Sequence, residues 1–212
     1  MTEPRVPRYT GASVRRVEDP RLVAGRGRYL DDIRLHGLLH AAFVRSPHAH
    51  ARLLHVDAAP ALASRGVVAA LTAHDVAGRD LTLSPRLDAP GFVPTTWAAL
   101  PASRVRFVGE PVAVVAASDP YAAADGCEAV VVEYEPLPAL SDIDGALAPG
   151  APLLHDAVPG NVLIERRYAH GDVDGSFAAA AVVVRETFTH GRCSASPIEP
   201  RGLIARWEGD DL

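Results

Sequence analysis

Cysteine, lysine and long apolar runs are scarce in this sequence. The 212 residues include two cysteines, Cys127 and Cys193, and these do not form a C-x-x-C pair. A zinc knuckle or an iron–sulfur cluster therefore cannot be assembled from this chain alone, although a single disulfide between the two is compatible with the sequence. Lysine is absent, and we attribute the all-arginine set of 21 basic residues to genome composition and not to a mechanism.

No run of about 18 apolar residues occurs, and the first residues lack the apolar region of a secretion signal. We therefore expect no membrane span and a cytoplasmic protein with two reduced thiols. The formal charge of −5 and the lack of a basic run argue against a nucleic-acid surface, because phosphate binding needs clustered cations. With 48% apolar residues, the chain can bury one substantial core or two small ones.

The first part of the chain alternates strand and helix patterns. Residues 1–25 are rich in proline, arginine and glycine without periodicity, and we expect them to form an extended arm. Three strands are predicted over residues 37–46, 51–57 and 65–76, with a short helix over 58–65. This order predicts an α+β fold.

The clearest pattern lies between residues 105 and 140. Residues 112–117 predict a buried strand, Ser118 or Asp119 caps a helix with Pro120 at its first position, and residues 130–134 predict another strand. Strand, helix and strand at this spacing predict a right-handed crossover that joins parallel strands. We therefore expect a mixed sheet.

Two irregular stretches separate these elements from the last part of the chain. Residues 83–104 contain four prolines and no sustained period, which predicts a long loop that is functional or lies against a partner. Residues 141–160 are rich in proline, glycine and alanine and are interpreted as a linker.

The last part predicts strands over residues 162–168, 182–190 and 202–208, and a capped helix over 171–180. Residues 209–211, Gly-Asp-Asp, are a turn signal that normally leads the chain into a partner strand. No such strand follows, and folded proteins avoid an uncovered apolar edge. We therefore expect these residues to be the beginning of a larger functional unit.

The motif "RSPHAHARLLHVD" raises the question of a metal site. In one continuous strand His48 and His50 would share a face and His55 would point the other way, so a third ligand, such as His40 or Asp57, would have to come from elsewhere. We favour a turn begun at Ser46 in which the imidazoles hydrogen-bond to the backbone and close a hairpin. No metal ligand is assigned.

Other polar motifs favour structural roles. "FVGEPVAVV" has one glycine and a proline, too few free amides for a phosphate loop, so Gly109 is interpreted as a turn or bulge and Glu110 as structural. Glu199 and Arg201 predict a local ion pair of small value. Cys193 has no identified base and is interpreted as inert.

Ser194 and Ser196 belong to no triad pattern. From these residues alone, no catalytic site is predicted.

Residues 16–53, the motif "FVGEPVAVVAA" at 107–117 and residues 171–212 together resemble one family. They are similar to the N-terminal part of the molybdenum-containing large subunit of the xanthine dehydrogenase and aldehyde oxidase family, in its bacterial carbon-monoxide-dehydrogenase-like branch. The resemblance implies an α/β hammerhead domain over 26–140, the linker at 141–160, and the incomplete beginning of a molybdopterin-binding domain over 161–212. It also implies that "RSPHAHARL" is a hammerhead signature and not a metal site.

The resemblance implies further that the complete enzyme holds molybdenum through molybdopterin cytosine dinucleotide or a related pterin. It would hydroxylate aldehydes or N-heterocycles, or oxidise carbon monoxide, with water as the oxygen source, and pass electrons to iron–sulfur and flavin subunits. Complete large subunits are several times longer, and the family's pterin loops and catalytic glutamate lie beyond residue 212. No catalytic, cofactor-binding or metal residue is therefore assigned here, and the chain alone is expected to bind no cofactor; the stretch 190–201 approaches the pterin region in the family.

Two hypotheses follow. In the first, the chain is the structural, N-terminal portion of a molybdenum hydroxylase large subunit, inactive by itself. In the second, it is a free-standing hammerhead-fold module for binding or assembly, without enzymatic activity. A free-standing module should have capped edges.

Overall fold

The computed structural model describes Tyr9 and residues 11–212. The chain divides into two compact units, one formed by residues 38–184 and the other by the described part of residues 1–37 with residues 185–212. The expected arm at 1–25 falls partly outside the described residues. Its described part contains a short helix, α1 (Asp19–Val23), and a 3₁₀ turn, η1 (Leu30–Asp32), follows.

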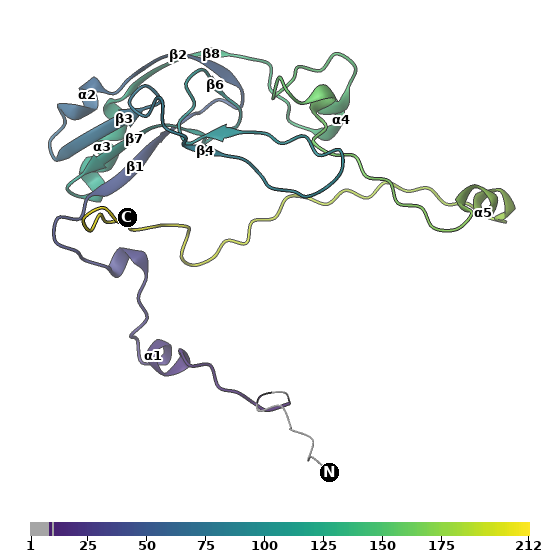
Figure 1. Cartoon of the computed structure of the whole chain (residues 1–212), viewed down its shortest axis with the longest axis horizontal. Helices are drawn as coiled ribbons and strands as arrows, with labels where there is room; N and C mark the ends of the chain where they lie inside the picture. Colours follow the sequence, from purple (N-terminus) through teal and green to yellow (C-terminus); the bar gives the residue numbers. More distant parts are fainter. Residues whose placement is uncertain (1–8, 10) are drawn as a thin grey trace. The chain divides into compact units, whose positions relative to one another are not determined.

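The unit of residues 38–184 contains two three-stranded sheets and a two-stranded one (Figure 1). The first sheet has the order β1-β7-β3, formed by β1 (His40–Arg45), β7 (Pro111–Ala117) and β3 (Val67–Thr72). The second has the order β6-β2-β8, formed by β6 (Arg104–Val105), β2 (Ala51–Asp57) and β8 (Val131–Pro136). The third pairs β4 (Thr82–Leu83) with β5 (Trp97–Ala98).

The α+β class is confirmed, but the predicted parallel crossover is wrong. Strand β7 lies in the first sheet and β8 in the second, and every strand pairing among the described residues is antiparallel, so the sheets are not mixed. Helix α3 (Pro120–Ala129) connects them. The sequence pattern gives strand, helix and strand in the right places, but it carries no information on which strands share hydrogen bonds.

Local signals set the ends of α3. The carboxylate of Asp119 accepts hydrogen bonds from the backbone N–H of Tyr121 and of Ala122 at 3.0 and 2.9 Å, and Pro120 occupies the first helical position. Because these donors have no partner within the helix, the cap stabilises its first turn. Asp119 and not Ser118 is therefore the cap.

Small side chains form the core between α3 and the first sheet. Ala113, Val115 and Ala117 of β7 are fully buried. Helix α3 presents Ala122 and Ala123 to the same side of the sheet, where both are buried, and helix α2 (Ala59–Leu62) adds the buried Ala61. Alanine and valine allow the helix to approach the strands closely, so this core is thin and sensitive to added volume.

The predicted linker at 141–160 contains two short elements, α4 (Ile143–Leu147) and most of η2 (Pro159–Asn161). Asn161 ties them together: its Nδ2 donates to the carbonyl groups of Ala146 and Pro152, both at 3.0 Å, and its Oδ1 accepts from the N–H of Leu154 at 2.9 Å. One amide side chain thus replaces the regular backbone pairing that this segment lacks.

The three strands predicted after residue 161 do not form within the described chain. Residues 162–168, 182–190 and 202–208 make no strand ladder, and most of their side chains are exposed. A strand needs a neighbour that pairs with it along its length, and within the described chain these segments make only single backbone contacts, such as that between the N–H of Val93 and the carbonyl of Leu163. The predicted helix is present as α5 (Val173–Ala179), capped by Asp172, whose carboxylate accepts from the N–H of Gly175 at 2.9 Å.

The predicted turn at 209–211 is also present. Glu208 and Asp211 form an isolated antiparallel bridge, and Gly209 between them has a φ of +67°. This backbone conformation favours glycine, which explains the residue type at the turn.

Candidate functional site

The histidine motif forms the connection between β1 and β2. Ser46 is buried, and its hydroxyl oxygen lies 3.0 Å from both the backbone N–H and the carbonyl of His48, which closes a tight turn. The ring of His48 rests on Tyr134 of β8 with 4.9 Å between centroids. Strands β1 and β2 belong to different sheets, so the prediction that this turn closes a hairpin is wrong.

His50 makes the backbone hydrogen bond that the sequence predicts for an imidazole here. The side chain is 6% exposed, and its Nδ1 lies 2.8 Å from the carbonyl oxygen of Pro138. A carbonyl only accepts, so Nδ1 carries the proton and donates. The carbonyl of His50 also accepts from the N–H of Leu137 at 2.9 Å. His50 therefore fixes the chain where it leaves β8.

The histidines do not converge. His40 lies on β1 and His55 on β2, in separate sheets, and His55 is exposed. In the part of the chain that the structure describes, no three histidine, cysteine, aspartate or glutamate side chains are grouped to hold a metal ion.

Glu110 is buried beside this turn. Its carboxylate accepts a hydrogen bond from the backbone N–H of Arg106, and its carbonyl accepts from the N–H of Ser46 at 2.9 Å. Gly109, with a φ of +89°, donates its N–H to the carbonyl of Ser46 at 2.8 Å. The carboxylate is thus held by backbone, which suits a structural role better than that of a base.

Tyr134 is a member of this cluster that the sequence did not single out. Burial raises the pKa of its phenol, and a hydrogen bond with the Ser46 side chain opposes that rise. The contacts of Tyr134 and Pro138 with the histidines bridge more than 80 positions, and no local pattern could have indicated them.

A second cluster joins the segment after α4 to the region of β6. Arg106 donates from Nε to the carbonyl of Leu154 at 3.0 Å, and Arg104 forms an ion pair with Asp156 at 3.2 Å. Burial lowers the pKa of His155, the positive charge of Arg106 lowers it further, and Asp156 partly offsets both. The two arginines hold this segment in place.

The long loop at 83–104 is largely irregular, as predicted, apart from the short strand β5 and its two end residues, Leu83 of β4 and Arg104 of β6. The hydroxyl of Ser84 donates to the carbonyl of Thr95 at 3.0 Å, and the N–H of Val93 donates to the carbonyl of Leu163 at 2.8 Å. Thr95 is 4% exposed, although the loop as a whole is mostly accessible. Contact of this loop with another subunit stays a prediction.

The remaining candidates lie in the last part of the chain. Glu199 does not pair with Arg201: its carboxylate accepts from the backbone N–H of Leu30 at 2.6 Å, which corrects the predicted ion pair. Cys193 is exposed and Cys127 is half-buried, both thiols are free, and burial raises the pKa of Cys127. The hydroxyl of Ser194 accepts from the N–H of Ser196 at 3.3 Å.

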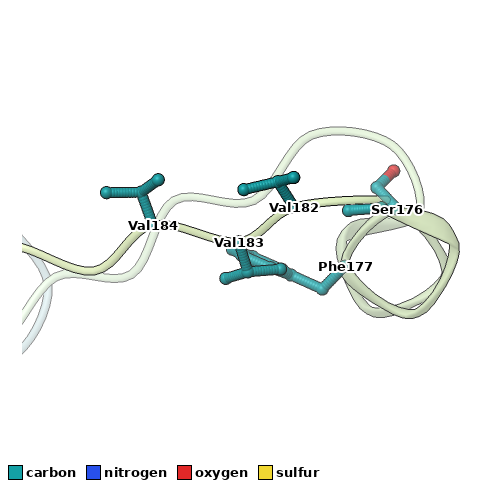
Figure 2. Close-up of a pocket in the computed structure, with 6 residues that line it drawn as sticks. Ser176, Phe177, Val182, Val183 and Val184 are labelled. Carbon is teal, nitrogen blue, oxygen red and sulfur yellow. The ribbon is translucent and has the colours of Figure 1, made fainter.

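An open apolar hollow lies beside α5. Figure 2 shows Phe177 of the helix reaching towards Val183 of the extended segment that follows, with Val182 and Val184 on either side. Phe177 is 58% exposed and Val184 75% exposed. The lining has no charged side chain, so the hollow suits apolar packing and not a polar ligand.

Comparison with known proteins identifies the family. A model described as "Aldehyde oxidase and xanthine dehydrogenase, a/b hammerhead domain" matches residues 24–138. The chain belongs to this family. A second model, "Molybdopterin cofactor-binding domain", matches residues 154–212.

Relatives within the family are large subunits of bacterial oxidoreductases. The chain is 39% identical over 198 residues to the nicotine 6-hydroxylase large subunit of Paenarthrobacter nicotinovorans, covering 93% of this chain and 24% of that protein. It is 41% identical over 208 residues to the carbon monoxide dehydrogenase large chain of Afipia carboxidovorans, covering 92% and 25%. The chain therefore spans about a quarter of the length of these relatives.

Among solved structures, quinoline 2-oxidoreductase from Pseudomonas putida 86 matches with a TM-score of 0.81 and 43% identity. The match covers 88% of this chain and 24% of that one. The fold expected from the resemblance is confirmed.

Proposed function

We propose that this chain is the N-terminal, structural portion of a molybdenum hydroxylase large subunit. The observation that carries the proposal is the match of both domain types in order, over most of this chain and about a quarter of the relatives. The hammerhead domain would occupy residues 26–140 and the beginning of the cofactor-binding domain residues 161–212.

We propose that these residues do not hold a pterin by themselves. In the stretch 190–201 no side chain is buried. The two buried polar atoms without a hydrogen-bond partner among the described residues, Nε2 of His50 and Oγ1 of Thr95, lie outside that stretch. We propose that this chain forms a scaffold and begins the domain whose other part would bind the cofactor.

For the complete protein we propose an oxidoreductase that holds molybdenum through molybdopterin cytosine dinucleotide. It would hydroxylate an aldehyde or an N-heterocycle, or oxidise carbon monoxide, with oxygen from water. Its electrons would pass to iron–sulfur and flavin subunits. The names of two relatives, a nicotine hydroxylase and a carbon monoxide dehydrogenase, support the N-heterocycle and carbon monoxide classes. The aldehyde class is supported by the description of the matching family, which names aldehyde oxidase.

We propose a cytoplasmic location, which two free thiols support. No helix in the described part of the chain is long and apolar enough to cross a membrane.

The test is recovery of the native complex through a tag on this chain in its own host, with mass and metal analysis of one sample. We expect these residues to be recovered together with the rest of a large subunit, as one polypeptide or two, and with molybdenum. A lone, metal-free, monodisperse monomer would instead support the free-standing module.

A matched experiment uses the 212-residue chain alone. It should carry no molybdenum and should reduce no artificial electron acceptor with carbon monoxide, aldehydes or N-heterocycles. Stoichiometric molybdenum in the isolated chain, or turnover by it, would show that the chain is not an inactive, structural portion.

A further inference from the structure

One face of the β1-β7-β3 sheet is apolar and uncovered. The register places Phe43, Val114 and Leu71 in one row across the three strands, and Ala41, Ala116 and Ala69 in the next. Directly paired residues project to the same side of a sheet, so these six side chains form one surface, here called the open face. Phe43 and Leu71 are 47% and 41% exposed.

Helices α2 and α3 lie on the other face. Ala113, Val115 and Ala117 alternate with the open-face residues along β7 and are fully buried, in the core to which α2 and α3 contribute. An antiparallel sheet with one solvated face normally alternates apolar and polar residues. On β7 the alternation is absent, because Val114 and Ala116 are apolar as well. The sequence of β7 is therefore that of a strand covered on both faces.

The size of the open face limits what can cover it. With strands about 4.8 Å apart and alternate residues about 7 Å apart, the six side chains cover on the order of 200–300 Å². A stable association between separate proteins needs about 800 Å² on each partner. A second copy of this chain seated here would thus not be held by this surface alone, whereas a segment of the same polypeptide is held at high effective concentration.

The shape fits one helix. Three strands are about 10 Å wide, close to the diameter of a helix with its side chains. The row of three alanines forms a shallow strip beside the taller row of Phe43, Val114 and Leu71, which allows a helix to approach closely. The only charged neighbour on β1 is Arg45 at the rim, whose guanidinium lies 5.5 Å from the ring centre of Phe43 and donates to the carbonyl of Gly109 at 2.9 Å.

We propose that the open face binds the apolar stripe of a helix, and that this helix belongs to the part of the large subunit beyond the equivalent of residue 212. The inference rests on the proposed function, since the relatives supply the three quarters of a subunit from which such a helix would come. The helix that binds the open face should carry apolar residues at positions i, i+3, i+4 and i+7.

The test is site-specific photocrosslinking in the native complex. A benzophenone amino acid replaces Leu71 in the tagged protein, expressed in its own host, and the crosslinked peptides are identified by mass spectrometry. The control position is Leu54 on β2 of the other sheet, which is 61% exposed. We expect position 71 to crosslink to one amphipathic segment beyond the equivalent of residue 212. These crosslinks should be at least tenfold more abundant than those from position 54.

Other occupants would overturn the proposal. Crosslinks from position 71 to an iron–sulfur or flavin subunit, to a second copy of the chain or to residues 9–37 or 185–212 would each do so, as would the absence of any crosslink. The molybdenum content and subunit content of the same purified sample distinguish a failure of the open-face proposal from a failure of the proposed function. A molybdenum-containing complex without the expected crosslink refutes only the open-face assignment, whereas a lone metal-free chain refutes the proposed function.

A pair of substitutions gives an independent readout. Leu71→Glu places a charge on a surface that is exposed in the 212-residue chain, so the melting temperature of that chain should change little. In the complete large subunit the same charge would be buried without a partner, and the melting temperature should fall by several degrees. Leu54→Glu should change neither. Equal effects of the two substitutions in the large subunit would contradict the proposal.

Discussion

Gly126 on α3 is the position where the packing of this chain is most sharply testable. A Cβ added there would lie 2.7 Å from Cγ2 of Val67 and 2.8 Å from Cγ1 of Val115. Carbon atoms in contact are normally about 3.5–4.0 Å apart, so each contact overlaps by about 1 Å. Both neighbours are valines on strands, whose side chains have little rotational freedom to move away.

The substitution Gly126→Ala therefore sets two effects against each other. Alanine is favoured over glycine inside a helix by about 1 kcal/mol. Overpacking of a closely packed core costs about 1–3 kcal/mol, and two rigid contacts place this site in the upper part of that range. We expect a net loss of about 1–2 kcal/mol in the free energy of unfolding, or a fall in melting temperature of about 2–8 °C.

The assay is urea unfolding of the 212-residue chain followed by far-ultraviolet circular dichroism. The midpoint should fall while the slope with denaturant stays unchanged. The control is Asp125→Ala, one position earlier on the exposed side of α3, which should change stability by less than about 0.5 kcal/mol. Combining Gly126→Ala with Val115→Ala should cost less than the sum of the single changes. A variant as stable as the parent, or strict additivity, would refute the packing argument.

Three further predictions concern titratable groups. Iodoacetamide should modify the exposed Cys193 faster than the half-buried Cys127, whose pKa is raised by burial, and unfolding should remove the difference. Equal rates in the folded chain would contradict this. Burial and the positive charge of Arg106 lower the pKa of His155, so the contribution of its neutral form to stability is complete above about pH 6.5 and declines as the pH falls through the folded pKa. The substitution His155→Gln should therefore reduce the dependence of the melting temperature on pH between pH 7 and pH 5. The backbone N–H of Ala122 in the first helical turn lowers the pKa of Asp119, so the contribution of this carboxylate to stability is present above about pH 4 and is lost as the pH falls through the folded pKa. The substitution Asp119→Asn should therefore lower the melting temperature more at pH 7 than at pH 3.

Much of the local structure could be predicted because its causes are local. Asp119 and Pro120 mark the start of α3, and Asp172 marks that of α5, through hydrogen bonds that reach only two or three positions. Strand β7 follows from a run of valine and alanine. Gly209 indicates the turn at 209–211, because the positive φ observed there favours glycine. Family membership was predicted from motifs in their order, and the comparisons confirm it.

Candidate-site predictions were less complete. An imidazole bound to backbone was expected and is observed for His50, but its acceptor, Pro138, lies 88 positions away. Glu199 was expected to pair with its neighbour and instead binds the N–H of Leu30, across 169 positions. In both cases the residue type indicated a hydrogen bond, and the partner was decided by the fold.

The sequence by itself thus determined helices α2, α3 and α5, the longer strands β1, β2, β3, β7 and β8, and the family to which the chain belongs. The short elements α1, α4, β4, β5 and β6 were not predicted. Only the tertiary structure decided that β7 and β8 join different antiparallel sheets, and that the residues after 161 form no strand ladder within the described chain. The physical reason is that helix caps and hydrophobic runs act over a few residues, whereas strand pairing requires partners that the chain brings together only when it folds.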